Sequence, residues 1–410
     1  MGRLAFVITA SFILLLTQNG TRLAGVVPRD ADGGGKSVQS PSDEKWLAWN
    51  RGTYLRGANI WLKRKGHEIY PTYTPQDLGD LAARGANYVN ISYPGIYNEK
   101  PHRHSPKYGT EKDVLKGLHD LVTWASAKGL YVVIAFRTGP QSFEMRFDAK
   151  NPPPEKLWSD ADARREWANM WRETAKEFRG ERAVVGYDLM VEPDTGGNKT
   201  LWLDLAKTII GAIREVDSAT PILVEPADWG GVDALTALDP LYLDPHGNLH
   251  IVYAAHQYVP TAYTQQTEGD WEYDCGPRMK DKKGRPKPEQ YVAYSAGYAA
   301  ELEGVYRRLG AWRDEKKVPV AVNEFGVIRW AGGYKDGKPA PDAHRFMEDQ
   351  LKLIEGLGLN YAVWKWDPAE CMGDDDYNFR HGQFFEKHTD VDSDLSNVIS
   401  AHWRAAATTH

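Results

Sequence analysis

The stretch AVVGYDLMVEP, residues 183–193, carries an apolar run into a carboxylate that is followed by proline. Apolar side chains dominate from Val184 to Val191, as in a strand that is buried on both faces. Pro193 has no backbone N–H to give to a central strand, so the strand must stop at Glu192. We therefore expect Glu192 to stand at the end of a buried strand and to face a cavity or solvent.

Runs of this kind, rich in β-branched and aromatic residues, occur eight times and alternate with segments of helical spacing. The strand-like runs are residues 53–60, 86–94, 130–140, 183–193, 221–231, 250–260, 318–327 and 360–368. The helical segments are residues 75–85, 111–129, 160–180, 199–217, 290–315 and 342–358. This alternation predicts βαβ units and a parallel sheet.

Eight such units fit one (β/α)8 barrel, the TIM barrel, whose size range includes this chain once insertions are counted. A doubly wound open sheet is the structural alternative, and it would require a glycine-rich phosphate loop after an early strand. The sequence contains neither GxGxxG nor a GxxxxGK motif followed by Ser or Thr. We expect a single α/β barrel with an extended loop after the sixth strand, over residues 261–288.

The amino-terminal segment has the composition of a targeting signal. Arg3 precedes an apolar run that is shorter than the roughly 20 residues needed to span a bilayer. We interpret residues 1–25 as a secretory signal peptide, with an uncleaved anchor as the alternative. The polar, Gly- and Ser-rich composition of residues 26–44 predicts a flexible linker to a catalytic domain at residues 45–408. The mature protein would then be secreted or periplasmic and not inserted in a membrane.

Composition narrows the possible partners. The net charge is −6 and the basic residues are scattered, so no nucleic-acid surface is predicted. The 15 Trp and 21 Tyr residues indicate a large core or an aromatic sugar-binding cleft. Export would allow a disulfide between Cys275 and Cys371, with two free buried thiols as the alternative. No set of metal ligands has a characteristic spacing, and we expect a monomer without a cofactor.

In such a barrel, catalytic groups come from the carboxyl ends of the strands. Almost every expected strand end carries a polar or aromatic side chain: Asn59, Asn90, Arg137, Glu192, Glu225, Trp229, His256, Tyr258, Asn323, Glu324, Trp364 and Trp366. Glu192 and Glu324 end strands four and seven, on opposite sides of an eight-stranded ring. Their carboxyl groups can approach to about 5–5.5 Å, the separation found in retaining glycosidases.

Two glutamates in this arrangement predict double displacement at a sugar. One must be an anion that attacks the anomeric carbon, and the other must be a neutral acid that protonates the leaving oxygen. We expect Arg137 and Tyr258 to keep Glu324 ionised. We expect an aromatic, water-poor surface to keep Glu192 protonated.

The fragments YLRGANIW, GYDLMVEP, HQYVPTAYTQQ, VAVNEFGV and YAVWKWDP follow one another in an order that resembles glycoside hydrolase family 5. This is a cellulase-like family of retaining (β/α)8 glycosidases, and the resemblance runs from about Thr53 to Trp366. It implies that Glu192 is the acid/base, that Glu324 is the nucleophile and that Tyr258 donates a hydrogen bond to the nucleophile.

The resemblance also implies substrate-binding side chains around the two glutamates. His256 would contact the reacting sugar, and Trp364 or Trp366 would be its stacking platform. Together with other strand-end residues, the candidates for substrate binding are Asn59, Arg137, Trp229, His256, Tyr258, Trp364 and Trp366.

Three positions depart from the family pattern. Val191 stands where the family usually has an Asn that would hold the sugar 2-hydroxyl. Asn90 stands where the family has Arg, and Arg137 stands where it has His. We hypothesise that Arg137 replaces one or both lost functions, because a permanent cation can keep Glu324 ionised and its donors can reach a sugar hydroxyl.

These residues predict a retaining glycoside hydrolase that acts on a β-linked polysaccharide or oligosaccharide of the glucan or mannan type. Two alternatives stay open. The changed strand ends would also fit a barrel that binds carbohydrate without hydrolysing it. A transglycosylase would use the same two glutamates and would differ only in transferring the glycosyl group to a sugar hydroxyl rather than to water.

Overall fold

The computed structural model describes residues 41–65, 68–70, 73–96, 111–140, 142, 156–266, 291–331, 338–368, 377–380 and 393–407. The expected signal peptide, residues 1–25, and the two cysteines lie outside these residues. Helix α1, Pro41–Trp49, overlaps the last residues of the linker expected over 26–44, and the rest of that linker lies outside the described residues. Within the described residues, no helix is long and apolar enough to cross a bilayer.

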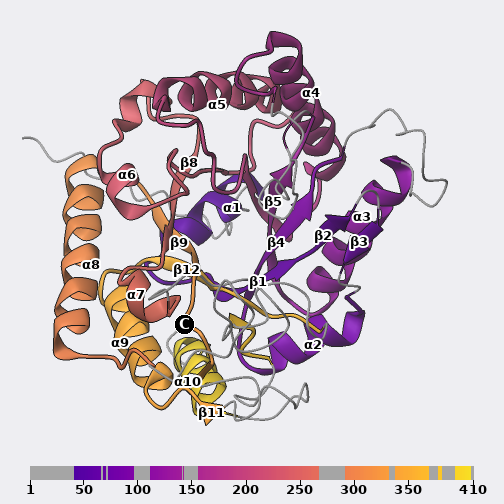
Figure 1. Ribbon diagram of the computed structural model, residues 1–410. Helices are drawn as coiled ribbons and strands as arrows, with labels where there is room; N and C mark the ends of the chain where they lie inside the picture. The colour runs from indigo at the N-terminus through magenta and orange to yellow at the C-terminus, as the bar shows by residue number, and fades with distance from the viewer. Residues whose placement is uncertain are drawn as a thin grey trace, which may run out of the picture. The chain divides into compact units, whose positions relative to one another are not determined.

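Eight parallel strands form a closed barrel (Figure 1). In chain order they are β1 (Arg56–Trp61), β4 (Tyr88–Pro94), β5 (Tyr131–Thr138), β6 (Val184–Asp188), β7 (Ile222–Val224), β8 (Ile251–Gln257), β9 (Val320–Phe325) and β12 (Asn360–Val363). Each strand overlaps one of the eight predicted runs, and the first pairs with the last to close the ring. The TIM-barrel prediction is confirmed.

Helices join these strands and cover the outside of the barrel (Figure 1). They are α2 (Pro75–Ala83), α3 (Glu111–Ala127), α4 (Ala161–Phe178), α5 (Lys199–Arg214), α6 (Val232–Thr236), α7 (Thr261–Thr264), α8 (Ala296–Lys316), α9 (Ala343–Gly356) and α10 (Asp394–Ala407), with a short 3-10 turn at Pro240–Tyr242. Every predicted helical segment is present. Helix α8 begins later than expected because Ser295 caps it by accepting the N–H of Tyr298.

Two short antiparallel pairs complete the described elements. They are β2 (Lys63–Lys65) with β3 (Glu68–Tyr70), and β10 (Trp330–Ala331) with β11 (Lys338–Pro339). Neither pair belongs to the barrel sheet. The segment between β8 and α8, predicted as an extended loop, begins with α7, and its continuation over residues 267–290 lies outside the described residues.

The barrel interior is apolar near the amino ends of the strands. Large and small apolar side chains pack together there: Leu55, Tyr88, Val133, Val185, Leu223, Val252 and Ala321. Trp49 of α1 packs against this cluster and donates from Nε1 to the backbone oxygen of Val185 at 2.8 Å. A larger core between strands and helices buries many of the tryptophans, including Trp167, Trp171 and Trp202, so much of the aromatic content serves packing.

Toward the carboxyl ends of the strands, the interior becomes polar. The amide nitrogen of Asn90 donates to Oδ1 of Asn59 at 2.9 Å, and the amide nitrogen of Asn59 donates to the backbone oxygen of Asn323 at 2.8 Å. Asn323 in turn donates to Asp188 at 2.6 Å. These buried side chains form a hydrogen-bonded layer directly beneath the strand ends, and this layer supports the groups described next.

Candidate active site

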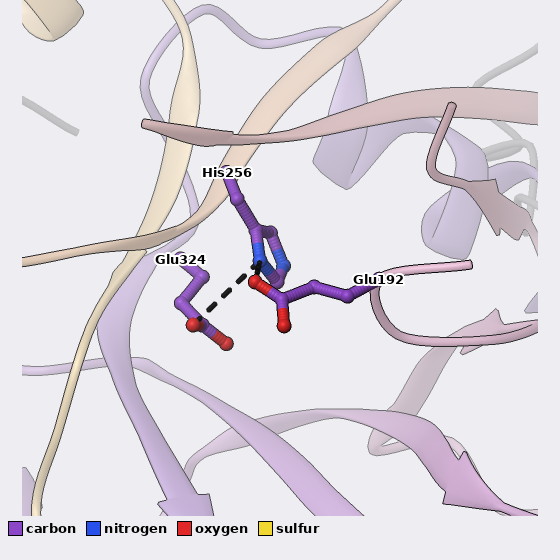
Figure 2. A group of neighbouring side chains, drawn as sticks. All are labelled: Glu192, His256 and Glu324. Carbon is purple, nitrogen blue, oxygen red and sulfur yellow. Dashed lines mark hydrogen bonds and ion pairs between the residues drawn. The ribbon is translucent and has the colours of Figure 1, made fainter. Parts of the chain in front are cut away.

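Glu192 and Glu324 approach one another at the carboxyl ends of the strands (Figure 2). Glu192 follows β6 and has a left-handed backbone with φ of 52°, whereas Glu324 belongs to β9. A carboxylate oxygen of one lies within 4.8 Å of a carboxylate oxygen of the other. The structure thus brings together the two carboxylates that the sequence assigned to strands four and seven.

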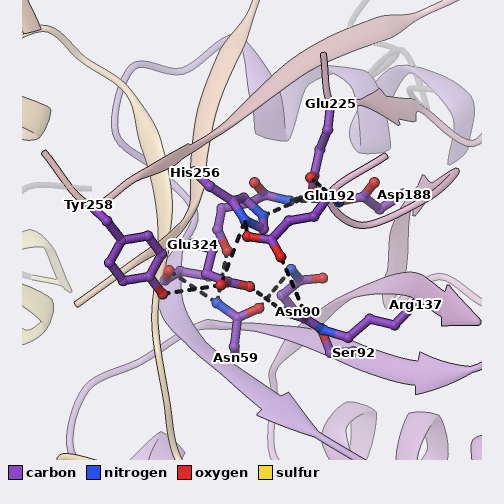
Figure 3. Close-up of polar contacts among 12 residues, drawn as sticks. Asn59, Asn90, Ser92, Arg137, Asp188, Glu192, Glu225, His256, Tyr258 and Glu324 are labelled. Atoms are coloured by element: carbon purple, nitrogen blue, oxygen red, sulfur yellow. Dashed lines mark hydrogen bonds and ion pairs between the residues drawn. The ribbon is translucent and has the colours of Figure 1, made fainter. Parts of the chain in front are cut away.

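His256 lies between the two glutamates and reaches a third carboxylate on its other side (Figure 3). Its Nδ1 is 2.8 Å from Oε1 of Glu192 and 3.6 Å from Oε1 of Glu324. Its Nε2 is 2.9 Å from Oε1 of Glu225. Burial by itself would lower the pKa of His256, but the surrounding carboxylates, Glu225 foremost, raise it well above its usual value. Both ring nitrogens face carboxylates, an arrangement that favours the charged imidazolium.

Glu324 is nearly enclosed, with 6% of its side chain exposed. Its Oε2 accepts a hydrogen bond from Nη2 of Arg137, and its Oε1 accepts one from the hydroxyl of Tyr258 at 3.1 Å. Burial raises the pKa of Glu324 to about 7, although the positive charges of His256 and Arg137 oppose this shift. Arg137 and Tyr258 are thus the partners that the sequence predicts for this carboxyl, but burial outweighs the charges of His256 and Arg137 in setting its pKa.

Arg137, on β5, bridges the two glutamates. Its Nη2 donates to Glu324 on β9, and its Nη1 is 3.9 Å from Oε2 of Glu192. Its Nε donates to the hydroxyl of Ser92 at 3.1 Å. The guanidinium also packs on indole rings, with Cζ 4.6 Å from the centre of Trp364 and 5.6 Å from that of Trp61. These contacts hold one permanent cation between two carboxylates.

Glu192 is the more exposed carboxylate of the pair, with 25% of its side chain accessible against 6% for Glu324. It borders a cleft of about 780 Å³ whose wall includes Trp229, Val232 and Val305. The predicted contrast is reversed: Glu324 has the water-poor setting, and Glu192 has the more open one. The reason is that β9 carries Glu324 within the ring, whereas Glu192 lies beyond the end of β6.

Residues 51–370 match the sequence family described as Cellulase (glycosyl hydrolase family 5). The chain belongs to glycosyl hydrolase family 5. The resemblance read from the sequence fragments is thus confirmed, and the protein is a glycosidase that hydrolyses O-glycosyl bonds.

Known relatives agree with this assignment. The chain is 24% identical over 372 residues to Endoglucanase C of Acetivibrio thermocellus, which covers 86% of this chain and 96% of that protein. It is 25% identical over 235 residues to Endoglucanase 3 of Fibrobacter succinogenes, covering 52% of this chain and 33% of that protein. The solved structure of endoglucanase Cel5A from Thermotoga maritima shares the fold, with a TM-score of 0.60 and 18% identity over 83% of this chain and 94% of that one.

The tryptophans predicted to bind substrate occupy different settings in this glycosidase. Trp229 is 44% exposed and lines the cleft beside Glu192. Trp364 is only 3% exposed and packs against Trp61 and the guanidinium of Arg137. Stacking of a sugar on Trp364 stays a prediction, and it requires this ring to be uncovered.

Two predicted binding residues lie away from the cleft. Trp366 is 1% exposed, and its Nε1 donates to the backbone oxygen of Asp77 at 2.9 Å. The period-two reasoning that placed it beside Trp364 is wrong because β12 ends at Val363, so strand alternation does not reach Trp366. Asn59 is fully buried with its amide bonded inside the barrel, and it supports the site from beneath.

Glu225 is a residue of the site to which the sequence assigned no role. It follows β7 directly and is fully buried, with its carboxylate against His256 and against the backbone N–H of Glu192. The sequence signal was present, since the run ILVEP repeats the Glu-Pro ending of the strand that carries Glu192. What the sequence could not show was that this carboxylate points back into the network.

Glu192, His256 and Glu324 also form a group of potential metal ligands among the described residues. Both ring nitrogens of His256 already face carboxylates, with Nδ1 2.8 Å from Glu192 and Nε2 2.9 Å from Glu225. Arg137 already places positive charge between the two glutamates. This set of donors suits paired carboxylates held by cations better than a metal ion.

Proposed function

We propose that this glycosidase cleaves internal bonds of a β-linked glucan and retains the anomeric configuration. The observation that carries the proposal is the approach of the carboxylate oxygens of Glu192 and Glu324 to within 4.8 Å. Retaining enzymes hold their two carboxyl groups about 5–5.5 Å apart, whereas inverting enzymes leave about 6.5–9.5 Å for a water molecule. The close approach of this pair supports the retaining arrangement, in which no water has to fit between the two carboxyl groups.

The reaction proceeds in two displacements. Glu192 must carry its proton when the substrate binds: it gives that proton to the leaving oxygen as ionised Glu324 attacks the anomeric carbon, so the glycosidic bond breaks while a bond to Glu324 forms. Glu192, now a carboxylate, takes a proton from water, and the water oxygen displaces Glu324 from the same carbon. Both glutamates return to their initial protonation states, and the sugar leaves with its original configuration.

The position of the cleft supports one direction for the bound substrate. Glu192 protonates the leaving oxygen, so the leaving part of the chain lies on its side of the site, in the cleft of about 780 Å³. Trp229 offers an exposed ring there, and the apolar faces of pyranose rings stack on indole. A cleft with room for a leaving oligosaccharide fits cleavage within a polymer.

The glucan assignment draws on relatives that are named endoglucanases. The match covers nearly the full length of these relatives. A solved structure of Thermotoga maritima Cel5A is described with cellobiose, and another with mannotriose. Both sugar types therefore belong in a test. The chain's own Val191, which replaces the usual Asn before the acid/base, bears on recognition of the 2-hydroxyl, where glucose and mannose differ.

The test is hydrolysis of β-glucans, mannans, xylan and their aryl glycosides, with the anomer released first identified by proton NMR. We expect β-glucan cleavage, initial release of the β anomer, and a loss of at least about 10³-fold in Glu324→Gln. Initial release of the α anomer would contradict the retaining mechanism. Products longer than the substrate would identify a transglycosylase, and binding without any turnover would identify a non-hydrolytic barrel.

We also propose that the enzyme is exported and acts as a monomer. The amino-terminal residues 1–25 have signal-peptide composition, and a polymeric glucan is too large to enter a cell. Amino-terminal sequencing of protein recovered from the medium or periplasm would locate the cleavage site. Light scattering of the same material would give its mass, and a dimer mass would contradict the monomer.

A further inference from the structure

We propose that Glu225 is a positioning residue that holds the acid/base Glu192, through its backbone and through His256, in the place where it protonates the leaving oxygen. This inference rests on the proposed roles of Glu192 and Glu324. Glu225 itself touches no reacting atom, because it is fully buried below the cleft.

Both carboxylate oxygens of Glu225 are committed to the site. Oε2 accepts the backbone N–H of Glu192 at 2.7 Å. Oε1 accepts Nε2–H of His256 at 2.9 Å and the amide of Asn323 at 3.2 Å. One carboxylate therefore fixes both the main chain of the acid/base and the imidazole that donates to its side chain at 2.8 Å.

The backbone of Glu192 needs such a restraint. Its φ of 52° is in the left-handed region, which costs a non-glycine residue free energy and persists only where neighbouring contacts enforce it. The hydrogen bond from this residue's N–H to the carboxylate of Glu225 is a charge-assisted contact in a buried setting. It opposes relaxation of the turn toward ordinary backbone angles, which would swing the Glu192 side chain away from the substrate.

The turn after β7 is shaped around this carboxylate. Asp228, Trp229 and Gly230 all have left-handed backbones, with φ of 66°, 61° and 68°. A Cβ on Gly230 would lie 2.9 Å from Oε2 of Glu225 and 3.2 Å from Cγ of His256. Glycine at this position thus permits the close contact between the carboxylate and the imidazole, and the same turn presents Trp229 to the cleft.

Charged groups from several elements surround the pair formed by Glu225 and His256. They are Asp188 beneath them on β6, Glu192 beyond β6, Glu324 on β9, and Arg137 on β5. Burial would raise the pKa of Glu225, but His256 and the hydrogen bonds it accepts lower it, so it is an anion. Burial and the charge of Glu225 raise the pKa of Asp188 well above its usual value, so Glu225 is the anion that pairs with the imidazolium.

Glu225→Gln tests the assignment because an amide has one acceptor where the carboxylate has two. The variant cannot accept from both Glu192 N–H and His256. We expect kcat/KM on a glycoside with a poor leaving group to fall about 10²-fold, since that substrate requires protonation by Glu192. On a dinitrophenyl glycoside, whose leaving group needs no proton, kcat/KM should stay within about threefold of wild type.

Two further variants separate the possible failures. Glu192→Ala should also lose more kcat/KM on the substrate with the poor leaving group than on the dinitrophenyl glycoside. Azide should restore its kcat on the dinitrophenyl glycoside. If neither result is seen, the proposed function itself is wrong. Asp217→Asn is the matched control, because Asp217 lies before β7 at the opposite end of the strand and accepts two backbone N–H groups and the hydroxyl of Tyr187. It should lower thermal stability and leave the ratio between the two substrates unchanged.

Equal losses of kcat/KM on both substrates in Glu225→Gln, with Glu192→Ala behaving as stated, would overturn the positioning role. If Glu225→Gln does not fold, the wild-type enzyme answers the question through 15N NMR of labelled histidine, with His256 assigned by substitution. The contact with Glu225 requires Nε2 of His256 to carry a proton at neutral pH. An imidazole without a proton on Nε2 would overturn the proposal, since His256 could not then donate to Glu225.

Discussion

Glu324 and His256 are partners across β9 and β8, directly after the register of these strands shifts between Ala255 and His256. The shift brings Nδ1 of His256 to 3.6 Å from Oε1 of Glu324 while the imidazole keeps its bond to Glu192. One cation therefore serves both carboxylates of the proposed mechanism. A local irregularity in strand pairing therefore sets the distance between His256 and Glu324, whereas Glu192 reaches the imidazole from the turn after β6.

The pH dependence of kcat/KM should carry the signature of the buried nucleophile. Glu324 attacks only when ionised, and burial raises its pKa to about 7 in the free enzyme. Activity should thus fall as the pH decreases through about 7, well above the range of an ordinary carboxyl group. A profile of kcat/KM against pH on an activated aryl glycoside measures this decline on the acidic side. An acidic limb near the usual carboxyl value would contradict the effect of burial.

Arg137→Met should move the acidic decline of kcat/KM to a still higher pH. The guanidinium is one of the cations that oppose protonation of Glu324, so its removal favours the neutral acid and moves the limb to higher pH. We also expect kcat to fall by about 10²-fold, as when one stabilising donor is removed from an active site. Arg137→Lys is the matched variant, because it keeps the positive charge and loses the paired donors of the guanidinium. The acidic decline of its kcat/KM should therefore stay at a pH closer to that of wild type. Full activity with an unchanged profile in Arg137→Met would show that this arginine has no role.

Trp229→Ala should weaken substrate binding without loss of stability. Its ring is 44% exposed on the side of the leaving group, so little packing is lost on truncation. We expect KM for long glucans to rise about tenfold, which corresponds to the loss of an aromatic contact of about 1.4 kcal/mol. Leu241→Ala is the control, because Leu241 is 64% exposed and does not line this cleft. Equal KM values for wild type and Trp229→Ala on polymeric glucan would show that Trp229 is not a stacking platform for the substrate.

Trp366 and Trp364 should respond differently to truncation. Trp366→Ala removes a fully buried ring and an N–H bonded to the backbone of Asp77, and should destabilise the protein by about 3–5 kcal/mol. Its folded fraction should keep the kcat of wild type. Trp364→Ala should lower kcat, because the ring beneath the guanidinium of Arg137 is lost. Thermal unfolding measured beside kcat distinguishes the two.

Trp366→Phe provides a milder form of this test. It keeps most of the packing, loses the hydrogen bond to the main chain, and should cost about 1 kcal/mol. A loss of kcat in Trp366→Phe without a loss of stability would return Trp366 to the list of substrate-binding residues.

The sequence was sufficient for the barrel because its signals are local. Alternation of apolar strand-like runs with helical segments specifies βαβ units, and eight of them leave one closed sheet as the simplest way to bury every strand. The short Glu-Pro ending at residues 192–193 likewise marked a carboxylate at a strand end. Helix α10 was not predicted, although the chain carries its apolar pattern and Ser393, whose hydroxyl accepts the N–H of Ser396 at the start of the helix.

The surroundings of the two proposed catalytic carboxylates could not be predicted from the sequence, because burial and charge at a strand end depend on residues that are distant in the chain. The sequence placed Arg137 and Tyr258 near Glu324, but the balance between burial and charge that raises its pKa to about 7 is a property of the assembled ring. Trp366 was misplaced for a related reason. Strand alternation applies only as far as the strand extends, and β12 ends at Val363.

By itself, then, the sequence determined the fold and the family and singled out two glutamates at strand ends, since each depends on the order of residues along the chain. Tertiary structure alone decided which glutamate is enclosed, how Arg137 bridges the pair, and that Glu225 lies behind His256 and Glu192. The physical reason is that charges in a low-dielectric interior respond to distances of a few ångströms, and closure of the barrel sets those distances.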